Sequence, residues 1–142
     1  QLPDRYESGT ANLPGIAGLL VGARFALSHR EEIEQCEDSR ARDLRTRLSA
    51  LRGVRVLGHP AAPKVGVVSF VPTAMDAGEL CDALAGEGFA LRAGLHCAPS
   101  VHQWLGTLHT GACRASVGIY NTESDVEMLT AAVGRLLSPG RA

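Results

Sequence analysis

The spacing of apolar residues changes once along this chain, and the change separates a helical part from a mixed part. Nearly every position from 13 to 27 is apolar, which predicts a helix that is buried or lies at an interface. Asn12 and Pro14 are typical of the start of such a helix. From about residue 29 to Arg52 apolar side chains recur near helical spacing, which predicts a second helix. Gly53 is placed to end it.

After Gly53 short apolar runs alternate with turn residues. We expect strands at 54–57, 65–71, 89–91 and 113–117, a loop at 60–63, and helices at 77–86, 100–105 and 126–137. Asp76 would cap the first of these helices, and residues 121–125 resemble a capped helix start. The sum is an α+β domain over residues 29–138, with a small antiparallel or mixed sheet covered by helices on one face. Residues 1–28 fit it poorly and predict an arm from a larger neighbour, and 139–142 predict a frayed tail.

Composition narrows the class of protein. The net charge is −1, with acids and bases mixed along the 142 residues, which argues against nucleic-acid binding. The apolar runs are too short to span a bilayer, and no secretory signal is visible at Gln1. The four cysteines lack the spacing of a zinc site or a redox pair, so we expect no metal, reduced thiols and a cytoplasmic location.

Cys97 is the strongest candidate for chemistry. It follows His96 directly and lies five residues after Arg92, and neighbouring imidazole and guanidinium groups favour the reactive thiolate. A free cysteine is more often a small buried apolar residue, and Cys36 and Cys81 take that interpretation because they fall in helical apolar patterns. His96 is either an acid or base near neutral pH or a solvated turn residue.

Arg114 lies inside a short apolar strand, where an unpaired guanidinium would be costly. Either a carboxylate of the protein neutralises it, or it binds an anionic ligand. Because arginine binds carboxylates through two parallel hydrogen bonds, a small acid is a natural ligand.

Four segments in order, 6–18, 65–70, 92–98 and 113–122, carry a family resemblance. The chain resembles the C-terminal part of the class V aminotransferase-type enzymes, which use pyridoxal 5′-phosphate (PLP). Within them it is most similar to the SUF-type cysteine desulfurases and selenocysteine lyases. The resemblance implies the small C-terminal domain of a fold-type I PLP enzyme, with residues 1–28 belonging to the PLP-binding large domain.

The resemblance also implies roles for single residues. Cys97 would take sulfur from L-cysteine as a persulfide and leave L-alanine, with His96 beside it as a second catalytic residue. Arg114 would bind the substrate carboxylate, Arg92 would support that site and the cysteine turn, and Thr10 would bind the PLP phosphate across a homodimer interface. The resemblance further implies that a sulfur-acceptor protein takes the sulfur from the persulfide and that the sulfur is used in iron–sulfur cluster assembly.

Departures from the family pattern are also visible. Leu95 stands where members often have a second histidine, and Ala11 replaces a usual proline. The single lysine, Lys64, matches no PLP-binding lysine, so the covalent anchor of PLP is expected outside this chain and the chain alone should be inactive. Cysteine and selenocysteine are not distinguished. Another class V enzyme (an aminotransferase, lyase or epimerase) and a non-catalytic sulfur carrier or interaction module remain alternatives.

Overall fold

The computed structural model describes residues 9–59 and 65–138. Its elements are α1 (Leu13–Ser28), α2 (Arg30–Ala50), β1 (Val54–Val56), β2 (Val67–Pro72), α3 (Ala77–Gly86), β3 (Arg92–Gly94), α4 (Pro99–Leu105), β4 (Ala112–Ser116) and α5 (Glu123–Leu137). The predicted loop at 60–63, Lys64 and the predicted tail at 139–142 lie outside the described residues. No helix in the described ranges is both long and apolar enough to cross a membrane.

Capping residues set the helix starts, as the sequence predicts. The Asn12 side chain accepts a hydrogen bond from the Gly15 amide at 3.1 Å and begins α1. Asp76 does the same for α3 through the Gly78 amide at 2.7 Å. Thr122 begins α5 in a reciprocal capping box with the side chain of Asp125.

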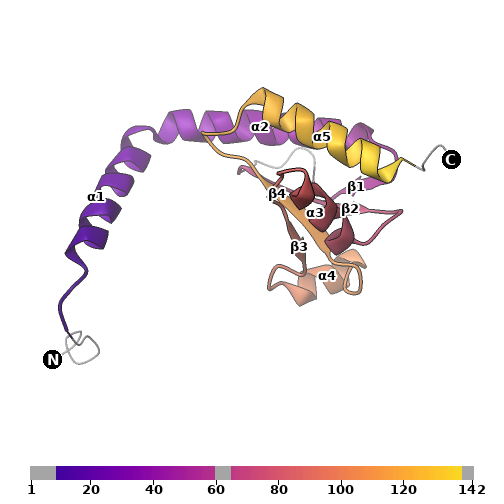
Figure 1. Cartoon of the computed structure of the whole chain (residues 1–142), viewed down its shortest axis with the longest axis horizontal. Coiled ribbons are helices and arrows are strands. Elements are labelled where there is room, and N and C mark those ends of the chain that lie inside the picture. Colours follow the sequence, from indigo (N-terminus) through magenta and orange to yellow (C-terminus); the bar gives the residue numbers. More distant parts are fainter. Residues whose placement is uncertain (1–8, 60–64, 139–142) are drawn as a thin grey trace.

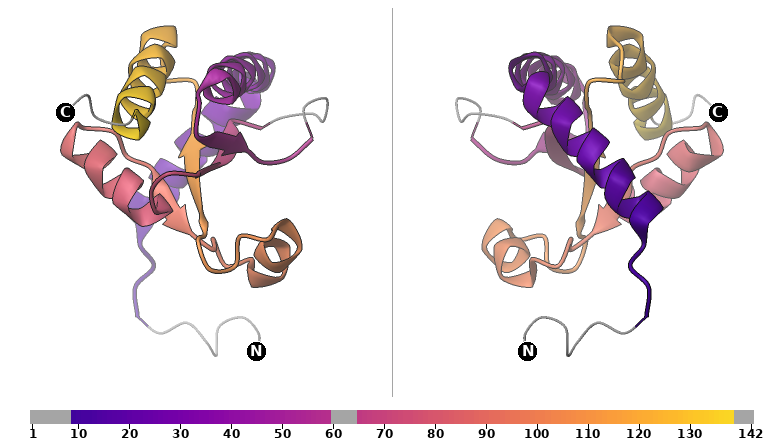
Figure 2. Two further views of the ribbon diagram at one scale, coloured as in Figure 1. Left: turned by 90° about the vertical axis from the view of Figure 1, so that its right-hand side faces the viewer. Right: turned by 90° about the vertical axis from the view of Figure 1, so that its left-hand side faces the viewer.

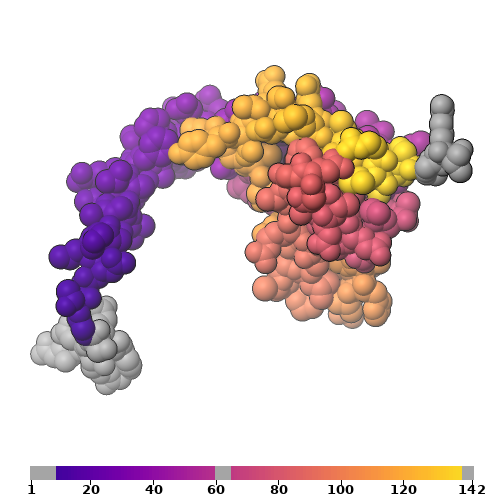
Figure 3. All heavy atoms as spheres, in the orientation of Figure 1, coloured from indigo at the N-terminus to yellow at the C-terminus, as the bar shows by residue number. Residues whose placement is uncertain are grey.

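The helix α1 extends away from the rest of the chain as an arm (Figures 1 and 3). None of its residues is buried, and Leu27 is 76% exposed. The expected burial of this apolar helix therefore does not occur within the described chain. An apolar helix exposed on all sides lacks the packing that stabilises most helices in water.

The four strands form one antiparallel sheet in the order β1-β2-β4-β3, which settles the choice between an antiparallel and a mixed sheet. The predicted strand at 89–91 was wrong. The strand is β3, three residues later, where Arg92 pairs with Arg114 of β4. Phe89 and Leu91 instead pack against the core, so their apolar character reflects burial at the sheet's end rather than strand pairing.

One face of the sheet is covered by α2, α3 and α5, whereas α4 lies apart at the end of the sheet (Figure 2). Alternate residues of the central strands point into this layer, because side chains of a strand alternate between faces. Val68 and Phe70 of β2 and Cys113 and Ala115 of β4 are buried there. Among the described residues, no layer of helices covers the other face of the sheet.

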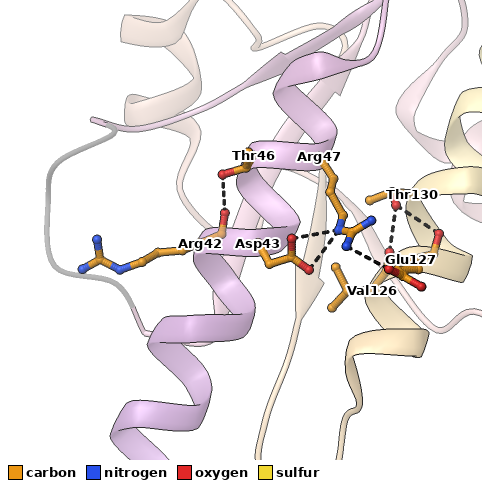
Figure 4. Close-up of polar contacts among 7 residues, drawn as sticks. All are labelled: Arg42, Asp43, Thr46, Arg47, Val126, Glu127 and Thr130. Atoms are coloured by element: carbon orange, nitrogen blue, oxygen red, sulfur yellow. Dashed lines mark hydrogen bonds and ion pairs between the residues drawn. The ribbon is translucent and has the colours of Figure 1, made fainter.

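A charged network fastens α2 to α5 at the edge of the core (Figure 4). Arg47 of α2 contacts Asp43 one turn earlier at 2.8 Å and Glu127 of α5 at 2.9 Å. These side chains are half-exposed, so the network orients the two helices more than it stabilises them.

A matched pair of leucine variants of this chain tests the separation of arm and core. Leu48 of α2 is fully buried, and Leu48→Ala should lower the free energy of unfolding by about 2–5 kcal/mol because it leaves a cavity. Leu27→Ala on the arm should change it by less than about 0.5 kcal/mol. Urea unfolding followed by circular dichroism measures both. Equal losses would show that α1 packs on the domain.

Candidate active site

The sheet register gathers polar side chains on the uncovered face. Ser69 of β2 lies opposite Arg114 of β4, which in turn lies opposite Arg92 of β3. Residues that face each other across antiparallel strands project to the same side. The three side chains therefore form a row across the sheet, with Arg114 in the middle.

Two cations lie side by side in this row, and neither makes an ion pair with a carboxylate of the described chain. The Nε atom of Arg114 is buried and has no hydrogen-bond partner within those residues. Facing like charges and a desolvated donor both destabilise a sheet. Arg114 was expected either to pair with a carboxylate of the protein or to bind an anionic ligand. The described residues supply no such carboxylate, so the site is suited to an anionic ligand.

A cavity of about 550 Å³ opens on this face, between the sheet and α4. Arg114 and Ser69 form its floor, and His96 and Ala98 border it from the turn after β3. On the α4 side it has an apolar rim that includes Trp104, which is 84% exposed. The cavity thus combines cationic hydrogen-bond donors with apolar walls, as expected for a small amino acid or a similar acid.

His96 borders this cavity as a neutral imidazole. Desolvation and the positive charge of Arg114 lower the pKa of His96, and a hydrogen bond with the Arg92 main chain opposes this shift only in part. The Nε2 atom is buried without a hydrogen-bond partner in the described chain. The lowered pKa favours the neutral imidazole, which is the form that can accept a proton.

Cys97 lies in a strained turn directly before α4. The Ala98 amide donates to the Leu95 carbonyl at 2.9 Å, and both central residues have positive φ, +49° at His96 and +58° at Cys97. Residues other than glycine rarely adopt this conformation. The thiol is exposed, and Cys97 lies outside the cavity lining, although its neighbours His96 and Ala98 belong to it. The thiol is therefore at the rim of the cavity.

The remaining cysteines have structural positions. Cys81 is buried on α3 and belongs to the core, which confirms its interpretation as a buried packing residue, whereas Cys36 on α2 is only half-buried. A hydrogen bond with Cys81 and burial raise the pKa of Cys113, which faces the helical layer. Within the described ranges no three histidine, cysteine or acidic side chains lie close enough to hold a metal ion.

The structure brings together four of the five predicted site residues. Arg92, His96, Cys97 and Arg114 all belong to the uncovered face or to the turn beside it. Thr10 does not join them, because it precedes the exposed arm α1 (Figure 1). Its predicted role in phosphate binding would require groups from elsewhere.

Sequence reasoning missed two residues of the cavity wall. Arg45 reaches it from α2, where its guanidinium donates to the carbonyls of Leu57 and Gly58. His102 reaches it from α4 and is only 5% exposed. Arg45 gave no signal, because it occupies a polar position of an ordinary helix. A histidine at an inward position of a short helix was the available signal for His102.

Comparisons with known proteins show the family of this chain. Residues 1–129 match the family model described as Aminotransferase class-V. A probable cysteine desulfurase from Xylella fastidiosa (strain 9a5c) is 36% identical over 132 residues, which are 92% of this chain and 31% of that protein.

Solved structures show the same fold. The apo structure of a cysteine desulfurase from Thermococcus onnurineus NA1 superposes with a TM-score of 0.84 at 30% identity and covers 95% of this chain and 34% of its own. A C-DES variant with glycine covalently linked to its PLP cofactor gives a TM-score of 0.72 at 25% identity, over 96% of this chain and 32% of its own. The chain spans about a third of the length of the relatives it matches.

The charge of Arg114 should be measurable in the titration of His96. Because its pKa is lowered in the folded state, His96 should stay neutral as the pH falls through its ordinary value of about 6.5 and should protonate only below it. Between a pH of about 6.5 and this lowered pKa, only the unfolded chain binds a proton at His96, so the free energy of unfolding should decrease as the pH falls through this range. Arg114→Gln should raise the pKa of His96, and Arg24→Gln on the arm should leave it unchanged. Imidazole proton NMR measures the titration. An unaltered His96 titration in Arg114→Gln would contradict the coupling.

Proposed function

Since this chain belongs to the class V aminotransferase family, we propose that it forms the C-terminal part of a PLP-dependent cysteine desulfurase. The reaction converts L-cysteine to L-alanine and holds the sulfur as a persulfide on Cys97. The observation that carries this proposal is the uncovered sheet face, where unpaired Arg114 lies beside the turn that exposes a thiol. The similarity to cysteine desulfurases supports it.

Arg114 binds the carboxylate of the substrate amino acid. Its guanidinium lies on the cavity floor without an ion pair in the described chain, and a bound carboxylate would accept hydrogen bonds from it in a two-pronged geometry. Arg92 in the next strand adds a second positive charge, which strengthens the attraction for a carboxylate. Together they orient the substrate by its carboxylate end.

Cys97 is the sulfur acceptor within the enzyme. Bound PLP would act as an electron sink that weakens the carbon–sulfur bond of cysteine. The Cys97 thiolate attacks the substrate sulfur, so that a sulfur–sulfur bond forms as the carbon–sulfur bond breaks. One L-cysteine and one Cys97 thiol thus give one L-alanine and one Cys97 persulfide, with no other reactant.

His96 assists by accepting the Cys97 proton. Its neutral state and its unpartnered Nε2 fit a base near neutral pH. After the transfer, the exposed position of Cys97 suits delivery of the persulfide to an acceptor protein, with iron–sulfur cluster assembly as the use of the sulfur. We propose a cytoplasmic location for this chemistry, since free thiols persist in reducing compartments.

The residues present fit part of a PLP site. Thr10 can donate its hydroxyl to a phosphate oxygen, Arg114 lines the cavity proposed for the substrate, and Cys97 lies at the rim of that cavity. We assign residues 1–28 to the PLP-binding large domain, because α1 is apolar and none of its residues is buried in the described chain, and residues 29–138 to the small domain. The lysine that anchors PLP would lie in the remaining part of the enzyme, and Thr10 would act across a homodimer interface. The chain alone should then be inactive.

Cys97→Ala in the full-length enzyme tests the nucleophile. Release of alanine from L-cysteine should fall to background while the absorbance band of bound PLP stays, because the variant lacks only the sulfur acceptor. Cys36→Ala should behave like wild type, since Cys36 lies on α2 outside the cavity lining. Mass spectrometry should find the added sulfur on Cys97 alone. Persistent alanine release from Cys97→Ala would favour a different class V reaction.

Arg114→Gln in the same enzyme tests substrate binding. Loss of a charged hydrogen-bond partner should raise the KM for L-cysteine about 10- to 100-fold, since such bonds contribute about 1.5–3 kcal/mol. Arg24→Gln on the arm is the matched control and should keep the wild-type KM. Steady-state alanine production measures both values. An unchanged KM in Arg114→Gln would place the carboxylate elsewhere.

A further inference from the structure

His102 is the one buried histidine of the chain, whose five histidines all lie in the described ranges. Its side chain extends inward from α4, in the middle of the segment 95–111 that leaves the sheet after β3 and returns to it at β4. Burial of an imidazole is costly unless its polar atoms are hydrogen-bonded. The partners of His102 therefore indicate what its burial achieves.

Thr107, which is 1% exposed, is the partner. The Nδ1 atom of His102 lies 2.8 Å from the Thr107 hydroxyl, and this hydroxyl donates to the His102 carbonyl at 3.4 Å. The hydroxyl can instead give its one proton to Nδ1, depending on the tautomer of His102, and in both arrangements the two side chains are hydrogen-bonded to each other. This is the one hydrogen bond between two side chains that the structure describes within 95–111.

The His102–Thr107 pair connects the Cys97 turn with the start of β4. At one end, the amide of His102 donates to the carbonyl of Ala98, which closes the Cys97 turn. At the other end, the carbonyl of Thr107 accepts from the Gly111 amide at 2.8 Å, directly before β4 and Arg114. A rigid link between His102 and Thr107 thus fixes the turn relative to the strand.

The His102 ring also lies against His96. The ring centroids are 6.2 Å apart, and both side chains line the cavity that has Arg114 on its floor. His96 and Cys97 are held in an unfavourable backbone conformation, which persists only when the surroundings enforce it. His102 is the buried side chain placed to do so from the α4 side.

We propose that His102 is a positioning residue of the sulfur-transfer site. Through Thr107 it locks α4 to the start of β4, supports the His96 ring, and holds the Cys97 turn in register with Arg114. It touches neither the substrate nor the transferred sulfur. The assignment rests on the proposed function, because it concerns the geometry between the nucleophile and the carboxylate-binding arginine.

Full-length enzyme carrying His102→Phe, Thr107→Val or Thr107→Ser tests the assignment, with rates expressed per PLP-loaded site. His102→Phe and Thr107→Val each remove the hydrogen bond at nearly constant size. Each should lower kcat about tenfold or more, because misplacement of a nucleophile is costly, and should leave the KM for L-cysteine within about twofold, because Arg114 is retained. Thr107→Ser keeps the hydroxyl and should retain wild-type kcat. The exposed His109→Phe is the matched control and should also match wild type.

The double variant His102→Phe with Thr107→Val separates a shared link from two independent effects. Its kcat should equal that of the single variant with the lower kcat, since both substitutions remove the same hydrogen bond. A loss equal to the product of the two single losses would overturn the link, as would wild-type kcat in both single variants or a KM that rises as much as kcat falls. A merely structural role would lower the melting temperature while leaving kcat per loaded site unchanged.

Two further outcomes keep the conclusions distinct. If His102→Phe fails to load PLP, the comparison of Thr107→Val with Thr107→Ser is the test. Thr107→Val should lower kcat and Thr107→Ser should not, and equal rates in the two variants would overturn the proposal. If Cys97→Ala keeps its alanine release, the proposed function fails, whatever the Thr107 variants do. Loss in Cys97→Ala with full kcat in His102→Phe and Thr107→Val would reject only the positioning role.

Discussion

The alternation of side chains along β4 is the constraint on which the site depends. Cys113 and Ala115 must face the helical layer, where they are buried, so Arg114 between them must face the other way. Because α2, α3 and α5 all pack on one face, nothing in the described chain neutralises the arginine on the opposite face. Shifting β4 by one residue would bury the guanidinium in the core and expose the core residues. The register of β4 that buries Cys113 and Ala115 therefore also places Arg114 on the uncovered face.

This arrangement leaves the two arginines with unfavourable electrostatic interactions that a bound anion would reduce. Arg92 and Arg114 face each other across two strands, and one guanidinium nitrogen of Arg114 is desolvated without a partner among the described residues. A folded domain tolerates such a local cost when the rest of its core is well packed. A bound carboxylate would relieve both the repulsion and the unmet hydrogen bond. The local instability thus favours binding of an acid over an empty site.

Sequence reasoning located most elements because capping residues and apolar spacing act locally. Asn12, Asp76 and Thr122 all lie at helix starts. It failed for β3, because the apolar residues at 89–91 are buried by packing at the end of the sheet, whereas the paired residues include Arg92. The cluster around Arg114 followed from the family resemblance of the motifs. The position of Arg45 depends on contacts with residues 57 and 58 of another segment, and that of His102 on the direction in which the short helix α4 faces. Local sequence patterns encode neither.

The proposed function requires that the Cys97 thiol reach both the substrate and an acceptor protein, and its position at the cavity rim is compatible with both requirements. A thiol buried beside Arg114 would meet the substrate but would be hidden from a second protein, and a thiol on a free loop would be accessible but badly aimed. In this chain the neighbours His96 and Ala98 line the cavity while Cys97 itself is exposed. The positive φ angles of His96 and Cys97 make this possible, since they turn consecutive side chains in directions that an extended strand does not allow. Such a turn needs support from its surroundings, and α4, with its buried His102 and Thr107, is the element that begins where the turn ends.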